Sequence, residues 1–427
     1  MKFYIYTLGC KVNTYESNVM GELLEKDDFI KVSDPKDADF IIVNTCTVTN
    51  MADNKSLKLI RQVNRANSKA VIVVCGCMPQ HDYRKLISLN NVGIIIGNKN
   101  KSKISDYIKK YMQSKKQIID IYDLKDIPFE EMKLNNFDKT RAFVKIQDGC
   151  NNFCSYCIIP YTRGNVRSKN PKEVLDEINK LIDNGHDEVV LTGIHTGHYG
   201  SEFENYNFGN LLNDILKIKK LKRLRISSIE ITEITDEILE IIKNNKVLVD
   251  HMHIPLQSGS DLILKNMNRK YDKVYFINKI NQIRKIRPDI SITTDVIVGF
   301  PGETDELFDE TIDTIKKTSF TKLHVFPYSR RTGTKADLME NQVSDVIKKE
   351  RVKVLMKLSK DLEINYMNKF LNEEVDVIAE IEKEGYLYGH SGNYLYIKFK
   401  GCKEMLHKNV KVEIKQIEYP YCIGEIK

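Results

Sequence analysis

Three short apolar runs near the start of the chain predict a small parallel sheet. They are FYIYTL (residues 3–8), DFIIVN (39–44) and AVIVVC (70–75), and their richness in Ile, Val and Tyr is typical of strands buried on both faces. Polar, helix-favouring segments separate them. Because strands that alternate with helices form α/β folds, we expect a doubly wound sheet within residues 1–115.

A cysteine lies at or just after the end of each run: Cys10, Cys46 and Cys77. Their spacing is about that of one strand–helix–strand unit of ~30 residues. Parallel strands end at the same edge of a sheet, where open α/β folds bind ligands, so we expect the three thiols to converge there. Buried structural cysteines are the alternative. Cys75 lies within the apolar run, and we expect it to be a core residue.

The central part of the chain predicts a partial barrel. Residues 115–140 are charged and irregular, which indicates a linker. Six strand-like runs follow, separated by helix-like segments: AFVKIQD (142–148), EVVLTG (188–193), RLRISS (223–228), HMHIPL (251–256), ISITTDVIVGF (290–300) and KLHVFPY (322–328). They predict a partial (β/α)6 TIM-like barrel over residues 136–366, with its chemistry at the C-terminal ends of the strands.

The last part of the chain has a different pattern. A basic helix, VSDVIKKERVKVLMKLSK (343–360), precedes it. The runs EEVDVIAEI (373–381), YLYIKFKG (394–401) and VKVEIK (410–415) then alternate apolar and polar residues, as half-exposed antiparallel strands do. We therefore expect a small antiparallel β-barrel over residues 368–427.

Composition narrows the classes of function. The formal charge of +7 is modest for 427 residues, so charge alone indicates nucleic-acid binding only weakly. No run approaches the ~20 apolar residues of a membrane span, and no leader-like segment opens the chain, so we expect a cytoplasmic protein without membrane contact. Nine cysteines in such a compartment suggest metal binding or catalysis rather than disulfides.

Cys150, Cys154 and Cys157 form a second set, directly after the first predicted barrel strand. A structural zinc site takes four protein ligands, so a distant residue such as His186 or His195 would have to complete it. A 4Fe-4S cluster also usually takes four thiolates, and with three one iron keeps an open position. The place of the set, where a barrel carries its chemistry, favours an open and reactive cluster.

A Cys-x3-Cys-x2-Cys motif at this place resembles the radical S-adenosylmethionine (SAM) superfamily. There the open iron binds SAM, and an electron from the cluster splits SAM to a 5′-deoxyadenosyl radical. The resemblance implies that Tyr156 lies beside the SAM adenine, that Gly193 in LTGIHTG lies near the amino-acid part of SAM, and that Gln257 in HIPLQSGS hydrogen-bonds SAM. Ordinary packing, turn and loop roles are the alternatives at these three positions.

The motifs TLGCKVNTYES, NTCTVT, GCMPQ, IQDGCNNFCSYCIIPYTRGNVRS, TDVIVGFPGET and HVFPYSRRTGT are together similar to those of the methylthiotransferases. The similarity covers essentially the whole chain and implies an N-terminal methylthiotransferase domain, a radical SAM core and an RNA-binding TRAM domain. It also implies that Cys10, Cys46 and Cys77 hold a second 4Fe-4S cluster that carries the methylated sulfur. A second SAM would supply the methyl group.

Three substrate classes exist in this family. GCKVN most resembles the branch that converts N6-threonylcarbamoyladenosine at position 37 of tRNA to its 2-methylthio derivative. The alternatives are the branch that modifies isopentenyladenosine in tRNA, whose sequences typically begin with a GCQMN-like motif, and the branch that modifies an aspartate of a ribosomal protein, whose sequences begin with a GCPKN-like motif. An iron–sulfur RNA-binding module without catalysis is an alternative of another class.

The resemblance implies three partners: the tRNA anticodon loop, an electron donor such as flavodoxin or ferredoxin, and a sulfur source. The basic helix would ordinarily be a solvated face, but beside a TRAM-like barrel it could contact phosphates. Its cations are Lys348, Lys349, Arg351, Lys353, Lys357 and Lys360.

Overall fold

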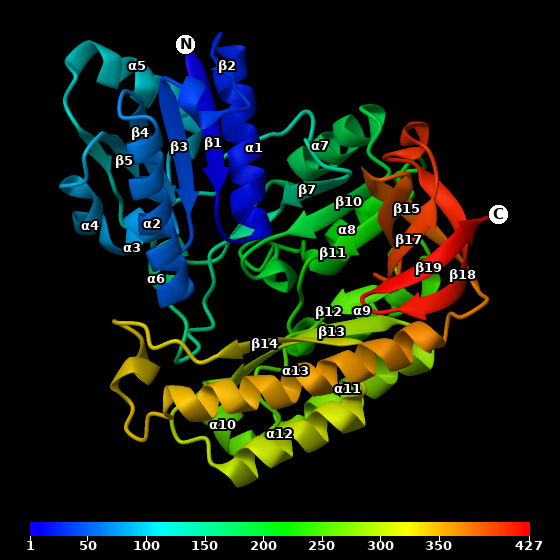
Figure 1. Ribbon diagram of the computed structural model, residues 1–427. Helices are drawn as coiled ribbons and strands as arrows, with labels where there is room; N and C mark the ends of the chain where they lie inside the picture. Colours follow the sequence, from blue (N-terminus) through cyan, green and yellow to red (C-terminus); the bar gives the residue numbers. More distant parts are fainter.

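The computed structural model describes residues 1–427, and its N-terminal part is a six-stranded parallel sheet (Figure 1). The strands lie in the order β2 (Ile30–Lys31), β1 (Lys2–Thr7), β3 (Phe40–Thr45), β4 (Val71–Gly76), β5 (Val92–Ile96) and β6 (Ile118–Asp120). The three strands expected from the apolar runs are confirmed as β1, β3 and β4. The short strand β6 lies in the segment expected to be a linker, so the sheet continues beyond residue 115.

Helices cover both faces of this sheet, as expected of a doubly wound fold. They are α1 (Lys11–Lys26) and α5 (Ile104–Ser114) on one face, and α2 (Asn50–Ala66), α3 (Cys77–Asp82) and α4 (Arg84–Ile87) on the other. The side chains of β3 alternate accordingly: Ile42 joins the core under α1, and Ile41 and Val43 join the core under α2. This alternation explains why residues 40–43 of the strand are all apolar.

Six parallel strands form the predicted partial barrel. One half is β7 (Arg141–Lys145), β10 (Glu188–Thr192) and β11 (Arg223–Ile226), and the other is β12 (His251–His253), β13 (Ser291–Val298) and β14 (Lys322–Pro327). A parallel bridge between Leu224 and Leu248 joins the halves. The intervening helices are α7 (Pro171–Asp183), α8 (Phe208–Leu216), α9 (Asp236–Asn244), α10 (Asp261–Asn266), α11 (Lys273–Ile286) and α12 (Asp305–Thr318).

The C-terminal strands close into a small barrel, as expected. Their order is β15 (Glu374–Lys383), β16 (Tyr386–Ser391), β17 (Tyr396–Lys400), β19 (Tyr421–Ile426) and β18 (Asn409–Glu418). Neighbouring strands are antiparallel, except that β17 and β19 run parallel. Arg223 fastens this barrel to the central one by donating hydrogen bonds to the Asp376 carbonyl (2.7 Å) and the Asn409 side chain (2.8 Å).

The basic helix is α13 (Asp345–Asn368), which packs along β14 (Figure 1). It is not a uniformly solvated face, because Lys348 and Arg351 are buried and Arg351 pairs with Glu303 (2.6 Å). The other four cations are exposed along one side of the helix: Lys349, Lys353, Lys357 and Lys360. Every helix of the protein is too short or too polar to span a lipid bilayer.

Candidate active site

The cysteines of the N-terminal sheet lie where its central strands end. Cys10 follows β1 and caps the N-terminus of α1, Cys46 follows β3, and Cys77 follows β4 as the first residue of α3. Burial and the neighbouring thiols of Cys77 and Cys10 raise the pKa of Cys46 to about 12. The expected convergence of the three thiols at one sheet edge is therefore present in the structure.

Glycines allow the three loops to pack this closely. Gly9 has a φ of +99°, and a Cβ on it would lie 2.7 Å from the Cβ of Cys46. Gly76 has a φ of +103°, and a Cβ on it would lie 2.6 Å from the carbonyl oxygen of Thr45. An L side chain at either position would both strain the backbone and push the cysteine loops apart.

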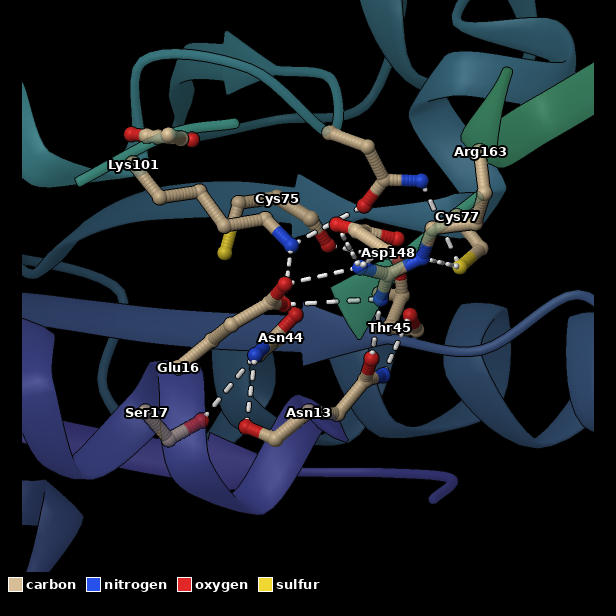
Figure 2. A network of polar contacts seen from close by, with 12 residues as sticks. Asn13, Glu16, Ser17, Asn44, Thr45, Cys75, Cys77, Lys101, Asp148 and Arg163 are labelled. Carbon is tan, nitrogen blue, oxygen red and sulfur yellow. Dashed lines mark hydrogen bonds and ion pairs between the residues drawn. The ribbon is translucent and has the colours of Figure 1, made fainter. Parts of the chain in front are cut away.

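Cys75 is separate from this set. It lies within β4, is fully buried, and belongs to the hydrophobic core on the α1 side of the sheet. In Figure 2 the sulfurs of Cys75 and Cys77 point to opposite sides. The expectation that Cys75 is a core residue is confirmed.

The second set lies in the loop between β8 (Gln147–Asp148) and α6 (Ile159–Arg163). Its three cysteines are half-buried, and the loop is closed by hydrogen bonds from the Cys150 amide to the Gly164 carbonyl (3.0 Å) and from the Cys157 amide to the Cys154 carbonyl (2.9 Å). Burial, followed by the charges of Cys154 and Cys150, raises the pKa of Cys157 to about 12.

The two histidines considered as further ligands lie in different surroundings. His186 is remote from the set and lies 3.1 Å from the side-chain oxygen of Asn136. His195 has its Nδ1 3.6 Å from the Cys150 sulfur, and its Nε2 pairs with Glu233. Burial disfavours a charge on the ring, but the contacts with Cys150 and Glu233 outweigh it and raise the pKa of His195 to about 10. His195 therefore lies between the Cys150 thiol and the Glu233 carboxylate, in contact with both.

Two arginines that the sequence did not single out also contact the cysteines. Arg163 donates from Nε to the Cys77 sulfur (3.3 Å), and Arg269 donates from Nη1 to the Cys154 sulfur (3.3 Å). Arg163 stands just before Gly164 in the YTRG segment of the motif that contains the second cysteine set, so its position could have suggested a role in the site. No neighbouring motif suggests such a role for Arg269. Each cysteine set thus has a buried cation that stabilises a thiolate.

Arg163 belongs to a buried ionic network that joins the N-terminal sheet to the barrel (Figure 2). Its Nη1 donates to Glu16 (2.7 Å), which also accepts from Lys145 (2.8 Å) and from Lys101. Asp148 pairs with Lys145 (2.6 Å) and with Arg163 (3.3 Å). These five side chains are at most 3% exposed, so the network fixes the two cysteine-bearing parts relative to each other.

A cavity of about 490 Å³ opens between the three parts of the molecule. Its wall includes Cys10 and Lys11, the strand ends at Gly193 and Ser228, inward-facing residues of β12–β14, and Tyr394 of the C-terminal barrel. The Tyr394 ring stacks on His251, with the ring centroids 4.6 Å apart. The C-terminal barrel therefore forms one side of the cavity.

The positions suggested as SAM contacts are placed differently. Gly193 lines the cavity, and a Cβ on it would lie 2.9 Å from the Gln147 amide oxygen. Tyr156 packs beside Cys154 and Arg269. Gln257 has a φ of +65° and bonds through its backbone to β13, outside the residues that line the cavity. Their contacts with SAM stay predictions.

The cysteine sets suit iron–sulfur clusters better than single metal ions. Thiolates around one zinc ion lie about 3.8 Å apart, as Zn–S bonds of ~2.3 Å in a tetrahedron require. No three cysteine sulfurs of this chain lie within 4.8 Å of one another. The cysteine sulfurs are therefore more widely spaced than those of a zinc site. This spacing, the number of thiols in each set and the buried cations that donate to them fit an anionic cluster with one open iron.

Comparisons with known proteins agree with this geometry. The radical SAM superfamily matches residues 144–315, and a family described as uncharacterized protein family UPF0004 matches residues 2–97. A relative in Bacillus subtilis (strain 168), the threonylcarbamoyladenosine tRNA methylthiotransferase MtaB, is 43% identical over 98% of this chain and 95% of that protein. The tRNA-2-methylthio-N(6)-dimethylallyladenosine synthase of Lachnoclostridium phytofermentans is 36% identical over 100% and 95%.

The solved structures add support for the fold. The radical SAM methyltransferase TsrM from Kitasatospora setae, with cobalamin and a [4Fe-4S] cluster bound, superposes with a TM-score of 0.58 at 13% identity over 78% of this chain and 73% of that one. Membership of the radical SAM superfamily implies a 4Fe-4S cluster and SAM as cofactors. With its two cysteine sets and its full-length similarity to curated relatives, the chain belongs to the radical SAM tRNA methylthiotransferases.

Proposed function

We propose that this protein converts N6-threonylcarbamoyladenosine at position 37 of tRNA to 2-methylthio-N6-threonylcarbamoyladenosine. The observation that carries the proposal is the cavity between the three parts of the molecule, which has Cys10 on one wall and the C-terminal ends of barrel strands on another. The relative in Bacillus subtilis, whose name states this substrate, supports the choice over isopentenyladenosine.

We assign residues 1–115 to the methylthiotransferase domain, 136–366 to the radical SAM core and 368–427 to the TRAM domain. Within this scheme Cys150, Cys154 and Cys157 would hold the SAM-binding cluster. A second cluster would be held by Cys10, Cys46 and Cys77. When bound, these groups would supply the radical, the sulfur and the methyl group that methylthiolation of an unactivated aromatic carbon requires.

The protein's own residues would hold these groups in place and shield them. Arg163 and Arg269 each donate to one cysteine sulfur, which favours the thiolate form that a metal needs, and His195 contacts a third. Tyr394 and its neighbours on the C-terminal barrel close one side of the cavity and would limit the entry of water. The anticodon loop suits this enclosed site, because its bases can leave the stack and enter a pocket.

Mass spectrometry of tRNA nucleosides tests the proposal directly. Cells that lack the gene should lose the 2-methylthio derivative of threonylcarbamoyladenosine and accumulate its precursor, and a plasmid copy should restore it. Loss of the methylthio derivative of isopentenyladenosine instead would assign the other tRNA branch. Unchanged nucleosides, together with no SAM cleavage by the reduced protein, would favour an RNA-binding module without catalysis.

A variant defines the part that the second cysteine set plays. The protein with Cys150, Cys154 and Cys157 replaced by Ala should keep about four of about eight irons, as expected for one of two 4Fe-4S clusters. It should lose all SAM cleavage. A variant that still cleaves SAM would refute the radical SAM assignment of these residues.

A further inference from the structure

Lys11 occupies an unusual position in the cavity wall. It follows Cys10 as the first residue of α1, and its half-buried side chain lines the cavity. None of the ion pairs and hydrogen bonds of the chain involves its ammonium group. A cation that is partly removed from water without a counter-charge is unfavourable, so the position suits an anionic ligand group.

The other charged groups of the cavity wall are already paired. Lys322 pairs with Glu363 (2.8 Å), and His253 lies 3.3 Å from Asp295. No further Lys, Arg, Asp or Glu side chain lines the cavity. The wall therefore offers one unpaired positive charge, next to the cysteine that would face the substrate.

The threonylcarbamoyl group supplies a matching negative charge. Threonine is joined to the carbamoyl carbon through its amine, so its carboxylate stays free and ionised at neutral pH. The dimethylallyl group that the other relatives' names specify is an uncharged hydrocarbon. The two substrates thus differ in charge, and the ammonium group of Lys11 would bind the charged one more tightly.

We propose that Lys11 binds the carboxylate of the threonylcarbamoyl group and so selects this nucleoside over uncharged ones. The inference rests on the proposed function and adds the residue that determines specificity. A charge-assisted hydrogen bond from an ammonium to a carboxylate in a partly desolvated site discriminates strongly against a neutral group. The chemistry of the reacting carbon is not assigned to Lys11.

The test compares binding of anticodon stem-loop RNAs to the full-length, cluster-loaded protein under anaerobic conditions. The RNAs carry threonylcarbamoyladenosine, its methyl ester, or unmodified adenosine at position 37. Fluorescence anisotropy gives each Kd for the wild type, Lys11→Met and Lys11→Arg. Lys26→Met makes the same change on an exposed position of the same helix and is the matched control.

Wild-type protein should prefer the threonylcarbamoylated RNA, and Lys11→Met should weaken its binding about 10- to 100-fold, as expected for loss of a hydrogen bond between charged groups. Binding of the methyl ester and of unmodified RNA should change little. Lys11→Arg should keep most of the preference. In turnover assays, Lys11→Met should raise KM more than it lowers kcat.

Several results would overturn the inference. Equal preference in the wild type and Lys11→Met, or an equal loss with all three RNAs, would show that Lys11 does not read the carboxylate. Lost iron or an altered EPR spectrum in RNA-free Lys11→Met would mean that the ammonium compensates the charge of the cluster instead. Wild-type protein without any preference for the threonylcarbamoylated RNA would overturn the proposed function as well.

Discussion

Replacing Glu16 by glutamine should loosen the N-terminal sheet from the barrel. The Glu16 carboxylate is 1% exposed and accepts from three buried cations, Lys101, Lys145 (2.8 Å) and Arg163 (2.7 Å). Glutamine keeps the shape of the side chain but removes the charge, which leaves Asp148 as the remaining carboxylate of the network.

Removing one partner of a buried ion pair costs about 3–5 kcal/mol, because the other charge stays buried without compensation. For a unit of 150–250 residues each kcal/mol lowers Tm by about 2–4 °C, so we expect the first unfolding transition to fall by about 6–20 °C. The network joins α1 to β7 and α6, so hydrogen exchange should increase on both sides of this contact.

Scanning calorimetry of the cluster-loaded protein measures this shift, and hydrogen exchange locates it. Glu25→Gln makes the same substitution on the exposed side of α1 and should leave Tm within about 1 °C of the wild type, as surface changes usually do. If Glu16→Gln behaves like Glu25→Gln, the network does not hold the two parts together.

Three further results are expected. Cys75→Ala should keep the iron content of the anaerobically loaded protein, whereas Cys77→Ala should lose about half of it, as iron analysis would show, and the reverse pattern would exchange the roles of the two thiols. Lowering the pH should destabilise the wild type below about pH 4.3, and Glu16→Gln less, in denaturant titrations of the metal-free protein. Burial alone raises the pKa of Glu16, but its three cations hold that pKa well below its usual value, so the unfolded chain binds a proton that the folded chain does not. Charge removal along the exposed side of α13 should weaken tRNA binding and reduce the salt slope by about one per phosphate-contacting lysine, whereas an unchanged slope would place the phosphate contacts elsewhere. The substitutions are Lys349→Gln, Lys353→Gln, Lys357→Gln and Lys360→Gln.

The strands were largely predictable because burial leaves a local pattern. The stretch FIIV within DFIIVN is apolar at every position because both faces of β3 meet helices. The edge strand β6 was missed because three residues give no usable period, and only pairing with β5 defines it. The parallel pairing of β17 with β19 was likewise invisible, because alternation shows which face is buried and not which neighbour is bound.

The cysteines of the site were predictable, and their charged partners were not. A cysteine that follows a predicted parallel strand can be placed from the sequence, because the C-terminal ends of such strands lie at one edge of the sheet. Arg269 and Lys101 resemble ordinary surface cations in the sequence, and their burial depends on carboxylates and thiols from other segments. For the same reason the basic helix was expected to be a solvated face, although its residues Lys348 and Arg351 are buried against the barrel.

Two cations that follow cysteines of the two sets in the sequence make contacts far from their own segment. Arg163 follows the second set along the chain but donates to Cys77 of the first, so the spacing between the sets depends on a buried contact. Lys11 follows Cys10 but points into a cavity whose far wall belongs to the C-terminal barrel. A nucleoside that fills this cavity would meet the thiol-bearing edge, the strand ends and Tyr394 at once. Selectivity for the modified base and alignment of the reacting carbon would then come from one enclosed site, while α13 and the outer barrel surface need only hold the rest of the RNA.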